Sequence, residues 1–445
     1  MSDKDAKRDR PGQYYACIDL KSFYASVECV ERGLDPFSTN LVVADPDREE
    51  ATICLAITPA MKALGIKNRC RVFEIPKGVR YIMAKPRMRL YMERAADIFS
   101  IYLRYISPDD IHVYSIDECF IDLTPYLKLY KTTPKDLVRM LTDAVFRDTG
   151  ITATAGIGTN LFLAKVALDI TAKKSPDGLG FLDNGRFLDT VAHHRPITDI
   201  WNVGHGTAAR LEKFGVYDLA GVARLPEKTL YREFGINAEY LIDHAHGLEP
   251  CTIADIKAYK PMATSLSNSQ VLFEPYSFEE AKIILKEMVE TSVLDIVSRR
   301  LATNSVSLSV GYNRSRSPDR RIVTEPRNTG GSMRLSDYTN SLKELTGYFI
   351  QIYDRSTHRD IPIRNLAIGL GNLADESYIE GDMFTDTAKR ERERALLGAV
   401  VDIKERFGKN AIVKGISFEP KATARARNLM VGGHNGGEVP KSQNK

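Results

Sequence analysis

The stretch YSIDECFIDL, residues 114–123, places two adjacent carboxylates, Asp117 and Glu118, between two apolar runs. The alternation of apolar residues with other residues on both sides predicts two short strands, and we expect the acidic pair at the tip of the hairpin that joins them. Adjacent carboxylates repel each other, so the placement has two explanations. The pair is either a solvated hairpin tip or part of a cation site, and on the pair alone both explanations stay open.

The composition sets broad limits on the protein. A chain of 445 residues is too long for one ordinary core, which predicts three or four domains. A hydrophobic fraction of 43% with 27% charged residues is typical of a soluble globular protein, and a net charge of +4 gives only weak support for a nucleic-acid partner. The charged first ten residues and the lack of a long apolar run predict a cytoplasmic protein without signal peptide or membrane span. Six scattered cysteines without a C-x-x-C pair indicate reduced thiols and argue against a zinc site.

A third carboxylate, Asp19, lies where a predicted strand over residues 14–18 gives way to a predicted helix. Ser22 is expected to cap that helix, whose first N–H groups, around Phe23 and Tyr24, favour an anion such as phosphate. A carboxylate at the same point could hold a metal that also touches the phosphate. The alternative is that Asp19 only ends the strand and makes local turn bonds.

Taken together, Asp19, Asp117 and Glu118 suggest a shared metal site. Three acids at two strand ends can bind two Mg²⁺ ions, which prefer oxygen ligands and keep phosphates in their shell. Two lysines could pair with a triphosphate: Lys62, on a short helix, and Lys165, on the helix that follows a glycine turn. Both could equally be solvated surface charges, and the turn lacks the spacing of a Walker loop.

Two further regions are candidates for binding DNA. Residues 181–250 read as short helices broken by glycine, and WNVGHGTAARLEKFG, 201–215, reads as a helical hairpin that can point backbone N–H groups at a phosphate. An ordinary helix–helix turn explains this hairpin equally well. The hairpin residues expected to contact DNA are Val203, Gly204, His205 and Gly206.

The region after residue 262 has the predicted order strand 264–272, helix 278–300, strands 305–312 and 320–325, helix 337–354 and strand 363–370. This β-α-β-β-α-β order is that of a ferredoxin-like module. Between residues 299 and 364 there are 12 Lys or Arg and 6 Asp or Glu, an excess that fits a surface that grips the DNA backbone. The predicted DNA contacts are Arg299, Arg300, Arg314, Arg316, Arg320 and Arg321. A slightly basic, solvated domain is the alternative.

These motifs, in this order, resemble the Y-family translesion DNA polymerases, and most closely the UmuC-type branch of Gram-positive bacteria. The stretches that carry the resemblance are IDLKSFYASVE (18–28), ITPAMKALGIKNRCRVFEIP (57–76), YSIDECFIDLT (114–124), TATAGIGTNLFLAKVALDITAKK (152–174) and HHRPITDIWNVG (193–204). The resemblance implies an α+β, right-handed polymerase fold. Its parts are a charged N-terminal tail (1–12), palm (13–24 and 86–180), small fingers (25–85), helical thumb with a helix-hairpin-helix (181–250), linker (251–261), little finger (262–371), and a C-terminal helix with a disordered tail (372–445).

The resemblance also implies roles for single residues. Asp19, Asp117, Glu118 and the carbonyl of Leu20 would bind two Mg²⁺ ions, Phe23, Tyr24, Lys62 and Lys165 would contact the incoming dNTP, and Tyr24 would be the steric gate against ribonucleotides. Pro59 and Lys62 depart from the tyrosine and arginine common in relatives, which affects the grip on the triphosphate. Cys119 replaces a usual small residue and receives no role. EGDMF, 380–384, resembles a degenerate sliding-clamp peptide, with Met383 and Phe384 as its apolar contacts.

The implied function is template-directed, low-fidelity DNA synthesis with bypass of damaged template bases. The short fingers segment, 25–85, would enclose the nascent base pair poorly, which favours tolerance over discrimination. The expected partners are primer–template DNA and dNTP, with a sliding clamp and a UmuD-like accessory protein as further hypotheses. Two rival functions are an inactive accessory DNA-binding protein and a nucleotidyl cyclase. The three retained acids argue against the first, and the helical hairpin and basic module argue against the second.

Overall fold

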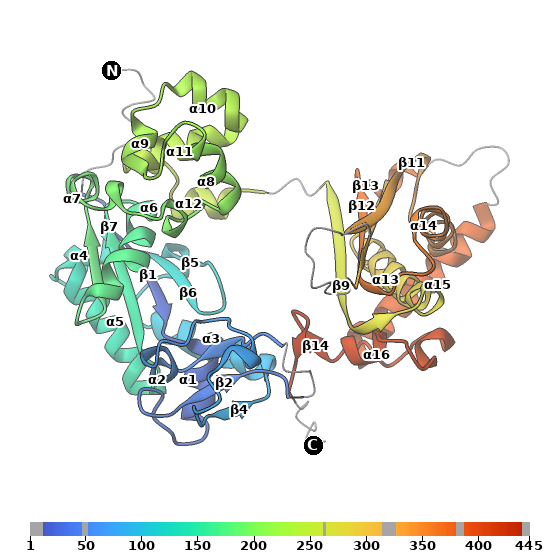
Figure 1. Ribbon diagram of the computed structural model, residues 1–445, viewed down its shortest axis with the longest axis horizontal. Helices are drawn as coiled ribbons and strands as arrows, with labels where there is room; N and C mark the ends of the chain where they lie inside the picture. The colour runs from blue at the N-terminus through green and yellow to red at the C-terminus, as the bar shows by residue number, and fades with distance from the viewer. Residues whose placement is uncertain (1–11, 47–51, 261–263, 314–325, 380–386, 438–445) are drawn as a thin grey trace. The chain divides into compact units, whose positions relative to one another are not determined.

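The computed structural model describes residues 12–46, 52–260, 264–313, 326–379 and 387–437 (Figure 1). By internal contacts the chain divides into two compact units, residues 1–260 with 436–445, and residues 261–435. In the described residues, no helix is both long and apolar enough to cross a bilayer.

The first unit is built on a five-stranded sheet with the order β5-β6-β1-β7-β8. Its strands are β1 (Tyr15–Leu20), β5 (Ile111–Val113), β6 (Glu118–Asp122), β7 (Ala153–Gly158) and β8 (Leu179–Leu182). All neighbours are antiparallel except β7 and β8, which are parallel. The central strand β1 is almost entirely buried, because both of its faces are covered by helices.

Helix α6 (Leu161–Val166) covers the face of the sheet that carries Tyr15 and Cys17, and it continues as a π-helical turn over Ala167–Thr171. The predicted helix over 161–172 is therefore present but changes its winding after Val166. Helix α3 (Met88–Tyr102) lies on the opposite face, against Ile18 and Leu20, and α5 (Pro134–Thr149) packs beside it.

Glycines in β7 allow α6 to approach the sheet very closely. A Cβ added at Gly156 would lie 2.1 Å from the carbonyl oxygen of Ala164, and one at Gly158 would lie 2.2 Å from the nitrogen of the same residue. Both contacts are with backbone, which cannot rotate away, so only glycine fits. The ATAGIG sequence of β7 thus determines the depth at which α6, and with it Lys165, lies on the sheet.

The segment between β1 and α3 begins with α1 (Phe23–Val30) and contains a small sheet of order β3-β2-β4 and the short helix α2 (Pro59–Ala63). The small strands are β2 (Leu41–Val43), β3 (Ala56–Ile57) and β4 (Ile82–Ala84). The expected cap of α1 by Ser22 is wrong: Ser22 has a left-handed backbone, with φ of 51°, and its hydroxyl makes no cap bond.

Short helices follow the main sheet, as the glycine-broken pattern predicts. They are α7 (Asn184–Asp189), α8 (His205–Glu212), α9 (Leu219–Ala223), α10 (Glu227–Phe234), α11 (Ala238–Ala245) and α12 (Ile253–Ala258). The first five pack around a core shared with α6, in which Phe162, Phe187 and Leu211 are fully buried. This core ties the helical region to the same helix that carries Lys165.

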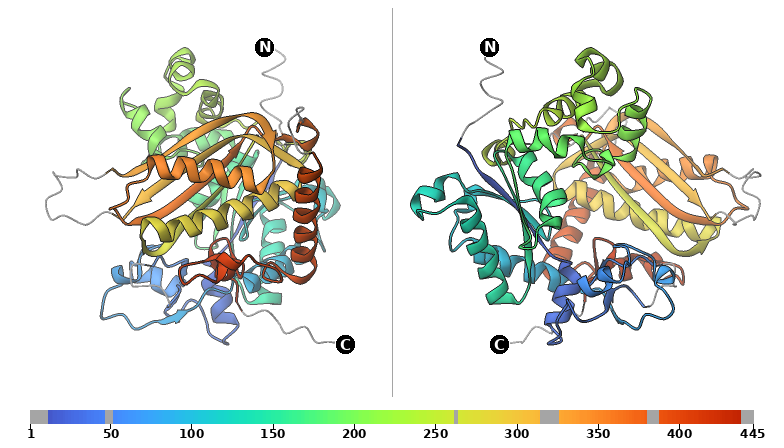
Figure 2. Two further views of the ribbon diagram at one scale, coloured as in Figure 1. Left: turned by 90° about the vertical axis from the view of Figure 1, so that its right-hand side faces the viewer. Right: turned by 60° about the vertical axis from the view of Figure 1, so that its left-hand side comes forward.

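The second unit has the predicted order of elements, β-α-β-β-α-β. They are β9 (Ser265–Tyr276), α13 (Phe278–Ser298), β10 (Leu301–Tyr312), β11 (Asn328–Thr339), α14 (Leu342–Ser356) and β12 (Ile363–Gly371). The antiparallel sheet has the order β11-β10-β12-β9, and both helices lie on one of its faces (Figure 2, left). A capping box of Ser277 and Glu280 begins α13, and Val306, Leu308, Val310 and Tyr312 of β10 are buried together. The third strand differs: it occupies 328–339, and the predicted strand 320–325 lies outside the described residues.

The segment after β12 continues as α15 (Thr387–Phe407), α16 (Ala424–Arg427) and a hairpin of β14 (Met430–Val431) and β15 (His434–Asn435). The helix agrees with the one expected over 385–407, whereas residues 430–437 are ordered where disorder is expected. Glu287 of α13 explains this docking, because its Oε2 accepts hydrogen bonds from the N–H groups of Thr423 and Ala424 at 2.9 and 3.0 Å. The segment is thereby held on the outer side of α13.

Candidate active site

Three carboxylates lie at the same end of strands β1 and β6. Asp19 of β1 is the direct cross-strand partner of Glu118 of β6, so their side chains lie on one face of the sheet. Asp117 lies in the turn that leads into β6, and its carbonyl oxygen accepts a hydrogen bond from the N–H of Leu20 at 2.8 Å. The predicted hairpin is present, and it brings the acidic pair next to Asp19, which is 98 residues earlier in the chain.

The local charge at this end of the sheet is unfavourable without a cation. Burial and, to a smaller extent, the negative charges of Asp117 and Glu118 together raise the pKa of Asp19 to about 7. Carboxylate and carbonyl oxygens are the donors that Mg²⁺ prefers. The donor set therefore fits a divalent cation by type and by charge. Within the described residues, however, no three Asp, Glu, His or Cys side chains form a ready-made metal cluster.

Lys165 and Cys17 account for the present position of Glu118. The ammonium of Lys165 lies 2.8 Å from Glu118 Oε1 and 3.2 Å from Asp169 Oδ2. The Cys17 thiol donates to the same Oε1 at 2.9 Å. Burial alone would lower the pKa of Lys165, but the hydrogen bond and charge of Glu118 outweigh it and raise that pKa. Lys165, predicted to face a triphosphate, is thus brought directly to the acids.

Cys17 and Asp169 are contacts that the sequence analysis does not predict. The spacing of each residue from a predicted site residue could have indicated its contact. Cys17 lies two residues before Asp19 on a strand, and Asp169 lies four residues after Lys165 on a helix, so each shares a face with a predicted site residue.

Lys62 of α2 belongs to the same electrostatic neighbourhood. Burial lowers the pKa of Lys62, and the positive charges of Lys21 and Lys173 lower it as well, while the negative charges of Asp19 and Asp117 oppose this shift. A partly desolvated ammonium beside two carboxylates is well suited to pair with an anionic ligand.

The two aromatic residues that open α1 have different environments. Phe23 is buried, whereas Tyr24 is half-buried and stacks on Tyr91 of α3, with ring centroids 4.6 Å apart and an interplanar angle of 18°. Burial raises the pKa of Tyr24, and the charge of Asp117 contributes to this rise. The Tyr24 hydroxyl therefore lies within electrostatic range of the acidic end of the sheet.

The residues predicted to contact DNA differ in their exposure, and some of them lie outside the described residues. Gly204 and Gly206 flank the start of α8, and a Cβ added at either would meet nothing within 4 Å, so this turn is open on its outer side. His205 is exposed and Val203 is buried. In the second unit, Arg299 is exposed and pairs with Asp295 at 3.0 Å, and Arg300 is also exposed. The other predicted DNA contacts, Arg314, Arg316, Arg320 and Arg321, lie outside the described residues, as do Met383 and Phe384, the predicted clamp contacts.

The sheet of the second unit has one open face made of small residues. Ser307 of β10 lies between Gly369 of β12 and Ser332 of β11, and Ser309 lies between Ala367 and Gly330. On β9, Ser265, Ser267 and Ser269 continue these rows and are exposed. The register shows that these serines of β9 and β10 belong to one surface on which neighbouring positions carry short side chains, Ser, Gly or Ala.

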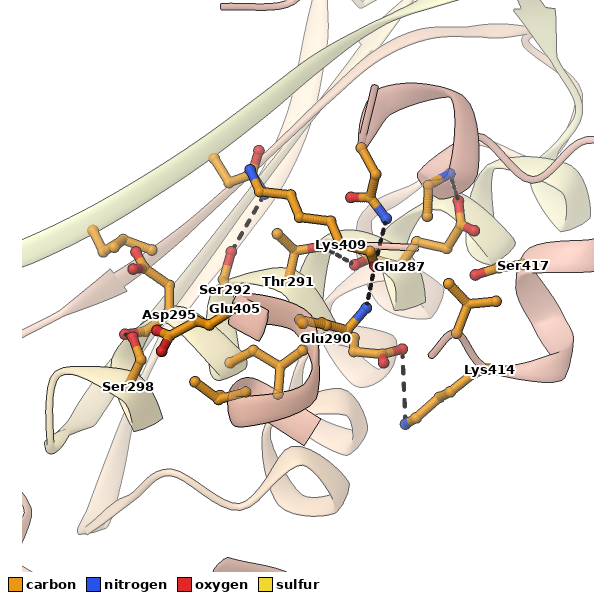
Figure 3. A pocket seen from close by; sticks show the side chains of 18 of the residues that line it. Glu287, Glu290, Thr291, Ser292, Asp295, Ser298, Glu405, Lys409, Lys414 and Ser417 are labelled. Atoms are coloured by element: carbon orange, nitrogen blue, oxygen red, sulfur yellow. Dashed lines mark hydrogen bonds and ion pairs between the residues drawn. The ribbon is translucent and has the colours of Figure 1, made fainter. Parts of the chain in front are cut away.

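A cavity of about 600 Å³ lies in the second unit between α13 and the docked C-terminal segment. Figure 3 shows Glu290 and Lys414 facing each other across it, at 3.9 Å, with Ser292 and Glu405 on nearby helices. Burial raises the pKa of Glu290, and the lysines at positions 414 and 404 oppose this rise. None of the predicted site residues lines this cavity, so the two features are separate.

Two family models match the chain. Residues 18–169 match the impB/mucB/samB family, and residues 263–383 match the impB/mucB/samB family C-terminal domain. The protein UvrX of Bacillus subtilis (strain 168), which is named for UV-damage repair, is 30% identical over 95% of this chain and 98% of its own length. The chain belongs to the impB/mucB/samB family. DNA polymerase IV 2 of the same strain is 29% identical over 94% of this chain and 97% of its own length.

A solved structure extends the comparison to the fold of this impB/mucB/samB protein. A Y-family DNA polymerase chimera of Dbh and Dpo4 superposes with a TM-score of 0.59 and 17% sequence identity, over 81% of this chain and 99% of the chimera. The α+β polymerase fold and the resemblance to the Y family, both predicted from the motifs, are confirmed.

Proposed function

We propose that this protein is a template-directed DNA polymerase of low fidelity that extends a primer past damaged template bases. The observation that carries the proposal is the pairing of Asp19 with Glu118 across β1 and β6, with Asp117 in the adjoining turn and Lys165 against them. Acids and a lysine gathered at strand ends suit phosphoryl transfer, whose catalysis is mainly positioning and charge stabilisation. The names of relatives such as DNA polymerase IV 2 support the same reaction.

In the proposed reaction the primer 3′-oxygen attacks the α-phosphorus of a dNTP and pyrophosphate leaves. Lys62 and Lys165 would pair with the triphosphate oxygens, and the N–H groups at the start of α1, by Phe23 and Tyr24, would orient its phosphates. Lys165 now pairs with Glu118, so binding a triphosphate exchanges one anionic partner of the ammonium for another. Tyr24 would exclude a ribose 2′-hydroxyl.

Divalent metal is part of this proposal. Asp19, Asp117, Glu118 and the Leu20 carbonyl would hold two Mg²⁺ ions, which supply activation of the attacking oxygen and stabilisation of the leaving one when bound. The raised pKa of Asp19 supports the assignment, because burial and the charges of Asp117 and Glu118 both disfavour its ionised form, and a bound cation would oppose both effects.

DNA is proposed to contact both units. The open turn at Gly204 and Gly206 can direct the N–H groups at the start of α8 to a backbone phosphate. The serine and glycine face of the second unit has short side chains, which let a phosphate backbone come close to the serine hydroxyl donors. Arg299 and Arg300 at one end of β10 would add positive charge. A sliding clamp and a UmuD-like protein are proposed as further partners on the sequence alone.

Primer extension with purified protein, Mg²⁺ and dNTPs tests the proposal. The variant Asp117→Ala should lose extension by orders of magnitude and keep its affinity for primer–template DNA, because a metal ligand is removed and no phosphate contact is lost. A matched control is Asp189→Ala, since Asp189 is exposed at the end of α7, and it should extend primers normally. Extension by Asp117→Ala at close to the wild-type rate would show that the assignment of the acids is wrong.

A further inference from the structure

The proposed steric gate, Tyr24, is held by a buried network that lies behind it. Tyr91 of α3 stacks on the Tyr24 ring and donates its hydroxyl to Glu28 Oε1 at 2.7 Å. Tyr24 and Glu28 are four residues apart on α1, so they lie on the same side of that helix, one turn apart. Tyr91 therefore contacts one turn of α1 at two points, with its ring at the gate and its hydroxyl at the acid.

Glu28, which accepts the hydrogen bond from the Tyr91 hydroxyl, is held in place by ion pairs. Glu28 is fully buried, and Arg87 donates to both of its carboxylate oxygens, from Nε at 2.9 Å and from Nη2 at 2.8 Å. Arg32 also pairs with this carboxylate from the same helix. Two guanidinium groups and a phenol satisfy the buried acid, which makes it a rigid anchor. Tyr91 is itself fully buried, so its ring has little freedom to move away from Tyr24.

We propose that Tyr91 is a positioning residue for sugar discrimination: its ring, anchored through Glu28, holds the Tyr24 ring in the orientation that blocks a 2′-hydroxyl. This inference rests on the proposed polymerase function and on Tyr24 as the gate. A gate ring excludes a hydroxyl only if it cannot rotate aside when the larger sugar enters. The stacked Tyr91 ring occupies the space into which Tyr24 would otherwise turn.

The network also has a position in the chain that suits this role. Glu28 lies at the start of the segment that leads into the small β3-β2-β4 sheet, and Arg87 and Tyr91 lie where the chain returns from it. The ion pair and the stacked rings thus join the residues at the beginning of that segment to the residues at its end. Any movement of the segment would be transmitted to the gate through the same contacts.

The test measures incorporation of ribonucleotides and deoxynucleotides side by side, as the ratio of their kcat/KM values. Tyr91→Leu removes the ring and the hydroxyl and should raise the rNTP-to-dNTP ratio on the order of tenfold, the scale of a lost aromatic stack. Tyr91→Phe keeps the ring and loses the bond to Glu28, and it should raise the ratio by a smaller factor. Tyr24→Ala is the reference for a missing gate and should give the largest ratio.

A control separates positioning from general loss of stability. Leu141→Ala in α5 also empties a fully buried position, and it should lower the melting temperature without changing the sugar ratio. An unchanged ratio in both Tyr91 variants, beside a raised ratio in Tyr24→Ala, would refute the role of Tyr91 and leave the polymerase intact. If Tyr24→Ala extends primers with an unchanged ratio, the gate and its support both fail. If Tyr91→Leu does not fold, Tyr91→Phe decides the outcome.

Discussion

Replacing Gly156 with alanine tests whether the depth of α6 sets up the active site. The added Cβ would lie 2.1 Å from both Ala164 O and Leu168 N, and 2.8 Å from the carbonyl carbon of Ala167. Ordinary contact begins near 3.4 Å, so the α6 backbone must retreat by about 1.3 Å. Overpacking of this kind costs about 3 kcal/mol. For a unit of this size that is roughly 6–12 °C in melting temperature.

The same retreat should damage catalysis beyond its effect on stability. Lys165 lies between the clashing residues Ala164 of α6 and Leu168 of the π-helical turn that follows it, and its 2.8 Å contact with Glu118 cannot persist over an added 1.3 Å without rearrangement. A misplacement of about 1 Å costs on the order of 100-fold in rate. We expect Gly156→Ala to extend primers about 100-fold more slowly at a temperature where it is still folded.

The assay combines thermal unfolding with primer extension well below the melting temperature. Gly185→Ala is the matched control, because its Cβ would meet only Asp183 Oδ1, at 3.6 Å, and it should match the wild type in both measurements. A Gly156→Ala protein that melts within 1–2 °C of the wild type and extends at the normal rate would refute the close-approach argument.

Three further predictions follow from separate features. The pKa of Glu28 is lowered, because the hydrogen bonds from Arg87, Arg32 and Tyr91 outweigh the effect of burial. The ionised side chain therefore stabilises the folded protein at pH values above the unfolded-state pKa, about 4.3. This stabilisation is lost as the pH falls through the lower pKa of the folded state. The melting temperature of wild type should therefore exceed that of Glu28→Gln most at neutral pH, and a gap that stays constant from pH 7 to pH 3 would contradict this. Ser307→Glu with Ser309→Glu should weaken primer–template binding in a titration at low salt while leaving the melting temperature unchanged, because both side chains are exposed; unchanged affinity would exclude this face from the DNA interface. Met383→Ala with Phe384→Ala should lose clamp pull-down but not extension of short primers, and a retained pull-down would leave the EGDMF match without a role.

Local patterns predicted most of the elements of the fold, because they depend on residues close together in the chain. The alternation of Val306, Leu308 and Val310 gives the buried face of β10, and Ser277 with Glu280 gives the start of α13. The predicted position of the third strand differs from that of β11, and the reason is also local. Its sequence, NTGGSMRLSDYT, has two adjacent glycines and few apolar residues, so it has no clear strand signal, and it is stabilised by pairing with β10 along most of its length.

Contacts between distant residues are what the sequence could not predict. Tyr91 contacts Glu28 across 63 positions, and Cys17 contacts Glu118 across 101. Neither pair has a local signature, since each depends on how α3 or β6 packs against elements far away in sequence. The candidate acids were suggested by their positions at predicted strand ends, and the resemblance of their motifs to a family then favoured a metal site over the local alternatives. The docking of residues 423–427 on α13 likewise depends on Glu287, the one charged residue of that helix that is buried.

The path of the chain between the two compact units makes the second unit an insertion in the first. The chain leaves the first unit after residue 260 and rejoins it at Gly436, whose carbonyl oxygen accepts a hydrogen bond from the N–H of Arg89 at 3.1 Å. The second unit is therefore held to the first at two points of the chain, and a unit joined at one point would be released more easily. A proteolytic cut after residue 260 would leave the two units joined only by the non-covalent contacts of the segment that follows residue 435.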